Sequence, residues 1–274
     1  PNQDSFSFTV LNRGWMVCLA CDGHGEQGEV VSERVARMLP LFLSLHLEES
    51  SIEEALPMAF RDAQSDLERC FSSAQAFSGA TVAVCCLSLE KPQAAWVAHV
   101  GDSRVVLGDL WSGQTVFTTE EHKAHDPSEY SRLEEAGAQV IQKRYDDGEV
   151  VSRIFIPKTG VPGLAMSRSL GDGCLKKYGV TAEPDVQDIS GLWQSCGAPA
   201  MVIASDGLWD TISVEETVAN LYGRCKNGRD VTLGVEALLR RSQRRWIEAE
   251  GDYCDDVTIL LVAPDASLVP PPAE

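Results

Sequence analysis

The sequence has little that would suit a membrane, a nucleic acid or an anionic surface. No apolar run reaches the roughly 18 residues that a membrane-spanning helix needs, so we predict no span. The 23 basic residues are outnumbered by 41 acidic ones, which gives a net charge of −18. We find no basic cluster that offsets this charge, and an acidic surface repels nucleic acid and anionic lipid. Net charge alone does not separate a cation-binding site from a merely soluble surface.

The nine cysteines also lack the pattern of a disulfide framework or a zinc site. Four of them lie in apolar, strand-like runs, where cysteine acts as a small hydrophobe. These are Cys18, Cys21, Cys85 and Cys86. The first two have the CxxC spacing, but no second pair follows, and residues three apart on a strand point to opposite faces. We therefore expect core cysteines and an intracellular, reducing location, either cytoplasmic or nuclear.

The length and the hydrophobic content set the scale of the fold. The chain has 274 residues, and 44% of them are hydrophobic, which is enough to bury a sizeable core. We find no internal repeat and no linker that would divide the chain. We predict one domain over residues 1–265 and a disordered tail over residues 266–274. Because the sequence begins at Pro1 rather than methionine, we expect it to be an excised domain.

The order of apolar patterns indicates the fold class. Short runs between turns predict strands over residues 5–10, 15–21, 80–89, 94–100, 104–110, 114–118, 150–156, 200–204 and 257–263. Helical spacing predicts helices over residues 29–47, 52–71, 214–224 and 231–250, with a short helix from Pro127 to Gly137. Helix pairs beside antiparallel strands favour an α+β layered sandwich with two sheets inside and helices outside.

Two capping boxes and one surface segment complete the local predictions. Ser51 with Glu54, and Asp126 with Glu129, have the spacing in which an N-cap side chain and the third helical residue satisfy each other's backbone. Residues 145–178 are mixed in composition and rich in glycine, which predicts a mobile surface segment.

Aspartates stand at the ends of the predicted strands. They are Asp22, Asp102, Asp206 and Asp255, and Asp4 precedes the first strand in the same way. A sheet can hold such residues close together at one rim, but two unit charges 4 Å apart repel by about 4 kcal/mol at an effective dielectric constant of about 20. Such a cluster needs protons or cations, and oxygen ligands suit Mg²⁺ or Mn²⁺.

A simpler interpretation stays open at this point. Aspartate followed by glycine is a common turn, so any one of these residues could serve the backbone alone. His24 lies two residues beyond Asp22 in a glycine-flanked turn, and its ordinary pKa suits a general acid. His122 and His125 have HxxH spacing but no third ligand nearby in the sequence, so we expect them to be structural or surface groups.

Taken in order, the motifs resemble those of the metal-dependent serine/threonine protein phosphatases of type 2C. The matching stretches are Asn2-Gln3-Asp4, Asp22-Gly-His-Gly25, Gly79-Ala-Thr81, Gly101-Asp-Ser-Arg104, Glu121-His-Lys123 with Arg132 and Ala136-Gly137, Met166-Ser-Arg-Ser-Leu-Gly-Asp172, Ser205-Asp-Gly-Leu-Trp-Asp210 and Asp255-Asp-Val-Thr258. Each motif is weak alone, but their number, order and spacing are specific. The resemblance implies a four-layer α-β-β-α sandwich with two central antiparallel sheets.

The resemblance also implies a site for two Mn²⁺ or Mg²⁺ ions. Asp22 would bridge the two ions, and Gly23 would offer its backbone carbonyl. Asp206 and Asp255 would complete the shell of the first ion. A water that bridges the ions would be the nucleophile, so no phosphoenzyme is expected.

The remaining implied roles fall on four other residues. Gln3 and Asp4 would hold waters of the second ion, and Asp102 would bind a third, weaker ion together with Asp206. His24 would be the general acid that protonates the leaving seryl or threonyl oxygen.

The chain departs from the family pattern at three places. Gln3 stands where the family more often has Glu, and Asp256 replaces a frequent Asn. The family carries a phosphate-binding arginine before the first acidic pair, whereas this sequence has no Arg or Lys before Arg13.

The leading hypothesis is a protein phosphatase that hydrolyses phosphoserine and phosphothreonine by two-metal catalysis, acts on phosphorylated protein substrates and is a monomer.

 The first alternative is a phosphatase-like fold kept as an inactive binding or regulatory module. The second is another two-metal hydrolase such as a nuclease, against which the acidic charge argues, and we expect no nucleic-acid partner. Residues 145–178 are the segment where we expect substrate specificity to lie.

Overall fold

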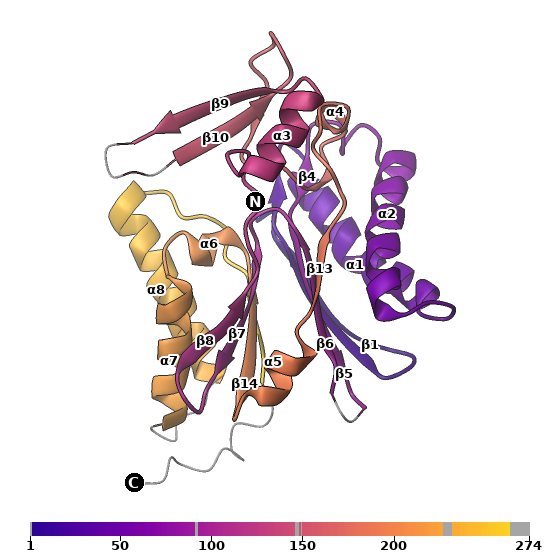
Figure 1. Ribbon diagram of the computed structural model, residues 1–274. Coiled ribbons are helices and arrows are strands. Elements are labelled where there is room, and N and C mark those ends of the chain that lie inside the picture. Colours follow the sequence, from indigo (N-terminus) through magenta and orange to yellow (C-terminus); the bar gives the residue numbers. More distant parts are fainter. Residues whose placement is uncertain (1, 91–92, 146–147, 149, 227–231, 264–274) are drawn as a thin grey trace.

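The computed structural model describes residues 2–90, 93–145, 148, 150–226 and 232–263, and its centre is a pair of antiparallel sheets (Figure 1). The first sheet has the strand order β1-β2-β5-β6-β13, and the second has the order β15-β14-β7-β8. The first contains β1 (Ser5–Leu11), β2 (Trp15–Cys21), β5 (Val82–Ser88), β6 (Ala95–Val100) and β13 (Asp185–Asp188). The second contains β7 (Arg104–Asp109), β8 (Gln114–Thr118), β14 (Pro199–Ala204) and β15 (Ile259–Val262).

Helices cover the outer face of each sheet (Figure 1). The pair α1 (Gly28–His46) and α2 (Ile52–Cys70) packs on the first sheet through a shared apolar core. The pair α7 (Val214–Lys226) and α8 (Thr232–Glu250) covers the second sheet in the same way. The four layers therefore follow the order α-β-β-α, and the predicted sandwich is confirmed.

The space between the sheets is filled by small and apolar side chains from both of them. Cys18 and Cys85 come from the first sheet, and Val105 and Met201 come from the second. Cys21 lies in the other core, under α1 and α2, so the two cysteines of the CxxC motif point to opposite faces. The eight cysteines whose side chains are described form no disulfide.

A smaller lobe lies at one end of the sandwich. It contains α3 (Pro127–Glu135), α4 (Gly173–Lys176) and the three-stranded sheet β11-β10-β9, with β9 (Gln139–Arg144), β10 (Val150–Phe155) and β11 (Pro162–Leu164). Its own core includes Leu133, Ile154 and Leu175. The described part of residues 145–178 contains strands, a helix and core residues, so it is not a surface segment throughout, and its mobility stays a prediction.

Short elements bring the sheet ends to the surface turns. They are β3 (Gly23–His24), β4 (Gly79–Ala80), β12 (Leu170–Gly171), α5 (Ser190–Ser195) and α6 (Asp206–Trp209). The sequence patterns did not predict them, nor β9, β11, β13 and α4, because two to six residues carry too little periodicity.

One of the two predicted capping boxes forms. Ser51 and Glu54 satisfy each other's backbone at the start of α2. The box at α3 is wrong, because Asp126 makes no side-chain cap and instead accepts a hydrogen bond from the Lys123 backbone at 3.2 Å. Glu129 is used elsewhere, as an ion-pair partner of two arginines.

Three further predictions concern the C-terminal tail, membrane-spanning helices and basic clusters. The predicted tail, residues 266–274, lies outside the described residues, so its disorder stays a prediction. Among the described residues, no helix is long and apolar enough to cross a membrane. The expectation that no basic cluster offsets the acidic charge is wrong, because four arginines line one groove between α7 and α8.

Candidate metal centre

The first candidate turn follows β2, and backbone hydrogen bonds and close backbone packing fix its position. Asp22 leaves β2, and its carbonyl accepts a hydrogen bond from the Thr81 backbone at 2.9 Å. Gly23 and His24 then pair with β4. A Cβ atom on Gly23 would lie 2.5 Å from the carbonyl oxygens of both Gln3 and Gly28, so only glycine fits here. The turn is therefore fixed by packing, and glycine is required for closeness rather than for a positive φ.

The second candidate turn follows β14 and is held from behind by α8. Asp206 begins the short helix α6. The carbonyl oxygen of the next residue, Gly207, accepts hydrogen bonds from Ser242 Oγ at 2.7 Å and from Trp246 Nε1 at 2.8 Å. Ser242 is fully buried, and both donors lie one turn apart on α8. Two donors on one carbonyl fix the direction in which the Asp206 turn faces.

The N-terminal residues close the same rim against the last strand. Asp4 Oδ2 accepts a hydrogen bond from Ser205 Oγ at 2.8 Å. Asp256 Oδ2 accepts one from the Gln3 backbone at 2.6 Å, and the Asp256 backbone donates to Asp255 Oδ1 at 2.9 Å. The departure Asp256 therefore joins the two ends of the chain. Gln3 is occupied by a different contact, since its side-chain amide donates to Glu29 at 3.0 Å.

The electrostatics show that these aspartates share one environment, which we call the aspartate rim: Asp4, Asp22, Asp102, Asp206 and Asp255. Burial and the charge of Asp206 raise the pKa of Asp22 well above its ordinary value. Burial and the charge of Asp102 raise the pKa of Asp206 to about 7, and burial also raises the pKa of Asp4. Asp255 contributes to the rise at Asp4 and at Asp206. The structure therefore brings together the residues that the sequence placed at separate strand ends.

Asp102 differs from the rest of the rim because it has a cation of its own. Lys123 Nζ donates to Asp102 Oδ2 at 2.5 Å, and the lysine is the residue after His122 in the Glu121-His-Lys123 stretch. Burial opposes the charged lysine, but the charges of Asp102 and Glu121 outweigh it and raise the pKa of Lys123. An ion at Asp102 would have to share this carboxylate with Lys123.

His24 is held by a residue that the sequence reasoning did not single out. Its Nε2 lies 2.7 Å from Asp172 Oδ2, which also accepts a hydrogen bond from Ser169 Oγ at 2.6 Å. Burial alone would lower the pKa of His24, but the negative charge of Asp172 outweighs it, and the net shift is upward. A Cβ atom on Gly79 would meet both His24 and Asp172, so the glycine of the Gly79-Ala-Thr81 motif makes room for this pair.

The donor set fits a hard divalent cation. Asp4 Oδ1 and Asp102 Oδ1 are buried and have no hydrogen-bond partner among the described residues. Buried carboxylates that raise one another's pKa are stable as anions only when a cation joins them. All the candidate ligand atoms are oxygens, which is the preference of Mg²⁺ and Mn²⁺.

A second set of ligand-type atoms does not converge in the same way. One nitrogen each of His99 and His122 and an oxygen of Asp185 lie within 4.8 Å of one another. The two rings are stacked with centroids 4.4 Å apart and planes 9° apart. A ring nitrogen binds a metal in the plane of its ring, so two parallel rings do not aim at one ion. His122 Nδ1 instead accepts a hydrogen bond from the Gly101 backbone at 3.1 Å, which is the structural role expected for it.

Comparison with known proteins gives a family match over a region that includes Asp22, Asp102 and Asp206. The family model described as protein phosphatase 2C matches residues 11–241. The chain belongs to the protein phosphatase 2C family. Members of this family are metal-dependent serine/threonine protein phosphatases. The chain is 32% identical over 258 residues to the probable protein phosphatase 2C 64 of Oryza sativa subsp. japonica and 30% identical over 314 residues to the probable protein phosphatase 2C 12 of the same plant.

The relatives differ in how much of their length the chain covers. Those two matches cover 90% and 95% of this chain, but 58% and 78% of the relatives. Among solved structures, the serine-threonine phosphatase 2C from Toxoplasma gondii superposes with a TM-score of 0.74 at 20% identity, covering 96% of this chain and 90% of that one. A C. elegans sex determining protein superposes with a TM-score of 0.69 at 21% identity, covering 96% of this chain and 61% of that one. These two structures share the fold.

Proposed function

We propose that this chain is an active phosphatase that hydrolyses phosphoserine and phosphothreonine in proteins at the aspartate rim. The observation that carries the proposal is the cluster of half-buried carboxylates, led by Asp22 and Asp206, whose pKa values are raised by desolvation and by neighbouring carboxylates. Such a set costs stability unless it binds cations, and a fold keeps a costly cluster where function needs it. The activity and substrates of the whole protein are part of this proposal.

The proposed ligands are Asp22, the Gly23 carbonyl, Asp206 and Asp255, with Asp4 and Gln3 on the side of the second ion. When bound, Mn²⁺ or Mg²⁺ supplies Lewis-acid chemistry, lowering the pKa of a water and neutralising phosphoryl oxygens. The chain's own part is orientation. Ser205 fixes one oxygen of Asp4 and leaves Oδ1 without a partner, while Ser242 and Trp246 fix the turn that carries Asp206.

His24 holds the proton that the leaving oxygen needs. Asp172 accepts a hydrogen bond at Nε2, which favours the protonated ring. Nδ1 is buried and has no hydrogen-bond partner among the described residues, so it is the nitrogen left to carry a transferable proton. The charge of Asp102 also raises the pKa of His24, which links this acid to the rim.

The first test is metal dependence on a phosphopeptide. We expect turnover with Mn²⁺, loss of turnover with EDTA, and recovery on adding Mn²⁺ back. Asp22→Asn should reduce turnover by at least about 10³-fold, while Asp252→Asn, an exposed aspartate, should leave it unchanged. Turnover that ignores EDTA would overturn the proposal. Phosphopeptide binding without turnover in any metal would favour the inactive binding module instead.

The second test concerns the acid. His24→Ala should reduce turnover of a phosphopeptide by about 10²-fold and that of an aryl phosphate far less, because a phenolate leaves without full protonation. An equal loss on both substrates would argue against the acid role and for a structural one.

We also propose an intracellular, cytoplasmic or nuclear location, supported by the free cysteines.

A further inference from the structure

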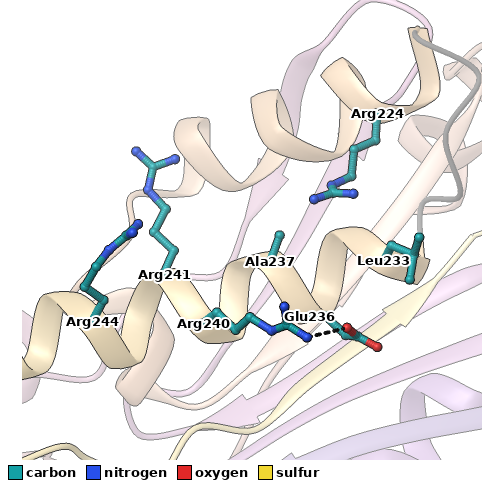
Figure 2. A pocket seen from close by; sticks show the side chains of 7 residues that line it. All are labelled: Arg224, Leu233, Glu236, Ala237, Arg240, Arg241 and Arg244. Carbon is teal, nitrogen blue, oxygen red and sulfur yellow. Dashed lines mark hydrogen bonds and ion pairs between the residues drawn. The ribbon is translucent and has the colours of Figure 1, made fainter.

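A groove rich in arginine is lined by residues of α7 and α8, the helix pair that forms one outer layer of the sandwich in Figure 1, and its side chains are drawn in Figure 2. Its volume is about 400 Å³, and it is lined by Arg224, Leu233, Glu236, Ala237, Arg240, Arg241 and Arg244. Four of these seven residues are cationic and one is anionic, in a chain whose net charge is −18. We call these seven residues the arginine groove.

The carboxylates around the groove are too few to neutralise it. Arg241 and Arg245 share the single carboxylate of Glu216. Arg240 pairs with Glu236 at 3.1 Å, but the two side chains are 79% and 61% exposed, so the pair contributes little. This pair is drawn as a dashed line in Figure 2.

The other two arginines of the groove, Arg244 and Arg224, are neutralised even less by nearby carboxylates. Arg244 lies 4.0 Å from Glu248, and both side chains are 67% exposed. Arg224 has no ion-pair partner in the part of the chain that the structure describes. The groove therefore presents several guanidinium groups whose hydrogen-bonding capacity is open to an anion.

Two apolar side chains, Leu233 and Ala237, also line the groove. Figure 2 shows Ala237 on α8 beneath the level of Arg224, which extends from α7, and Leu233 at the start of α8. Leu233 is 49% exposed. A ligand that fills this groove thus combines negative charge with some apolar surface, and a volume of this size accommodates a few side chains.

We propose that the arginine groove is a docking site for an acidic, phosphorylated segment of a protein substrate, separate from the aspartate rim. The planar guanidinium binds phosphate oxygens in pairs, which suits phosphoserine and phosphothreonine. A long polyanion such as a nucleic acid fits less well, because it would extend from the groove over an acidic surface. This proposal rests on the proposed function, since it names the class of substrate.

Most residues of the groove lie on α8, the helix that also supports the turn carrying Asp206. Arg241 and Arg244 flank Ser242, whose hydroxyl holds the Gly207 carbonyl beside Asp206. A segment docked on α8 is thereby kept on the helix that supports the metal centre, which raises the local concentration of a second phosphorylated residue there.

The binding test uses the full chain in EDTA, so that it does not depend on turnover. The probe is an acidic peptide with two phosphoserines and one leucine, compared with the unphosphorylated peptide by fluorescence anisotropy. The triple variant Arg224→Ala, Arg240→Ala, Arg244→Ala should weaken binding of the phosphorylated peptide by about tenfold or more. The matched control, Arg37→Ala with Arg61→Ala, changes exposed arginines on α1 and α2 and should leave the affinity within about twofold.

A kinetic measurement completes the test. With Mn²⁺, the triple variant should raise KM for the doubly phosphorylated peptide and leave kcat/KM for an aryl phosphate unchanged. The single reversal Arg240→Glu gives the same direction of effect if the triple variant does not fold. Equal affinity of the triple variant and the native chain would overturn the proposal, as would an RNA oligonucleotide that displaces the peptide at equal concentration. A chain that binds the peptide in EDTA but never turns over would refute the proposed function and leave the groove in place.

Discussion

Two groups of acidic side chains in this molecule, one half-buried and one fully buried, have opposite surroundings. At the aspartate rim, Asp22 and Asp206 lie beside other carboxylates, and their pKa values are raised. In the smaller lobe, Glu129 is 3% exposed and lies between two arginines, Arg132 at 2.6 Å and Arg168 at 2.7 Å. Burial opposes the Glu129 charge, but these hydrogen bonds outweigh it and lower its pKa strongly.

This difference shows that one chain uses acidic side chains in two ways, in a structural ion pair and in a candidate cation site. Glu129 has its cations built in, so its network joins α3 to the stretch before β12 without any ligand. Under the proposed function, Asp22 and Asp206 instead take their cation from solution. A raised carboxylate pKa therefore points to a binding site, and a lowered one points to a structural ion pair.

The largest expected effect is at the rim. Asp206→Asn should reduce phosphopeptide turnover by about 10³-fold or more, because it removes a proposed metal ligand. The same change should raise the stability of the metal-free chain at pH 8 by roughly 1 to 4 kcal/mol, because it removes a charge held at a pKa of about 7. Urea unfolding in EDTA measures the stability.

The sign of the pH dependence follows from the direction of the shift. A raised pKa means that stability is present at pH below the ordinary value of 3.8 and is lost as the pH rises through about 7. The metal-free native chain should thus lose stability between pH 3.8 and about pH 7, and Asp206→Asn should flatten this decline. Added Mn²⁺ should stabilise the native chain and not the variant. A variant that is less stable than the native chain in EDTA at pH 8 would contradict the comparison.

The next effect is in the smaller lobe and has the opposite sign. Glu129→Gln leaves two arginines without their buried carboxylate, so the chain should lose about 3 to 5 kcal/mol of stability at pH 7. Because the pKa of Glu129 is lowered, this contribution is present above the ordinary value of 4.5 and is lost as the pH falls below it. Urea unfolding at pH 7 and at pH 4 measures both statements.

A control at the surface sharpens this second prediction. Glu53→Gln, an exposed acid in the first turn of α2, should change stability by about 0.5 kcal/mol or less. The cost of Glu129→Gln should shrink at pH 4, since the native carboxylate then also loses part of its advantage. An equal cost at both pH values would mean that packing, and not charge, makes Glu129 important.

Residues near one another in the sequence were predicted best. The strand-end aspartates and His24 stand next to turn residues, so an apolar run followed by a polar turn was enough to find them. Asp172 was missed as a partner of His24 because 148 residues separate the two. Glu129 was assigned to a local capping box because the spacing allowed it, whereas its real partners include Arg168, 39 residues away.

The long elements of the fold were predicted from the sequence, whereas the arginine groove was not. The long strands and the two helix pairs repeat apolar residues often enough to be recognised, and their order determines the layers. Three of the four groove arginines lie close together in the sequence, at positions 240–244, but the net charge of −18 outweighed this short basic run in the prediction, and Arg224 comes from another helix. Only packing α7 against α8 brings Arg224 near Arg240 and Arg241.

The smallest expected effect tests how the rim is supported. Ser242→Ala removes the shortest of the three hydrogen bonds to the Gly207 carbonyl and keeps those from Trp246 at 2.8 Å and from Thr211 at 3.5 Å. We expect a loss of about 1 kcal/mol in stability and a several-fold weaker Mn²⁺ affinity, because the Asp206 turn is less well fixed. Thermal shift against Mn²⁺ concentration measures both.

Ser65→Ala is the matched control for this change. Ser65 also lies on a helix and donates to a backbone carbonyl, that of Arg61, at 2.9 Å, but it is exposed and belongs to α2. It should leave the Mn²⁺ affinity unchanged. If Ser242→Ala lowers the stability and leaves the Mn²⁺ affinity as it was, then α8 supports the fold alone. If the affinity falls, α8 belongs to the metal centre as well, and the rim depends on a buried serine far from it in sequence.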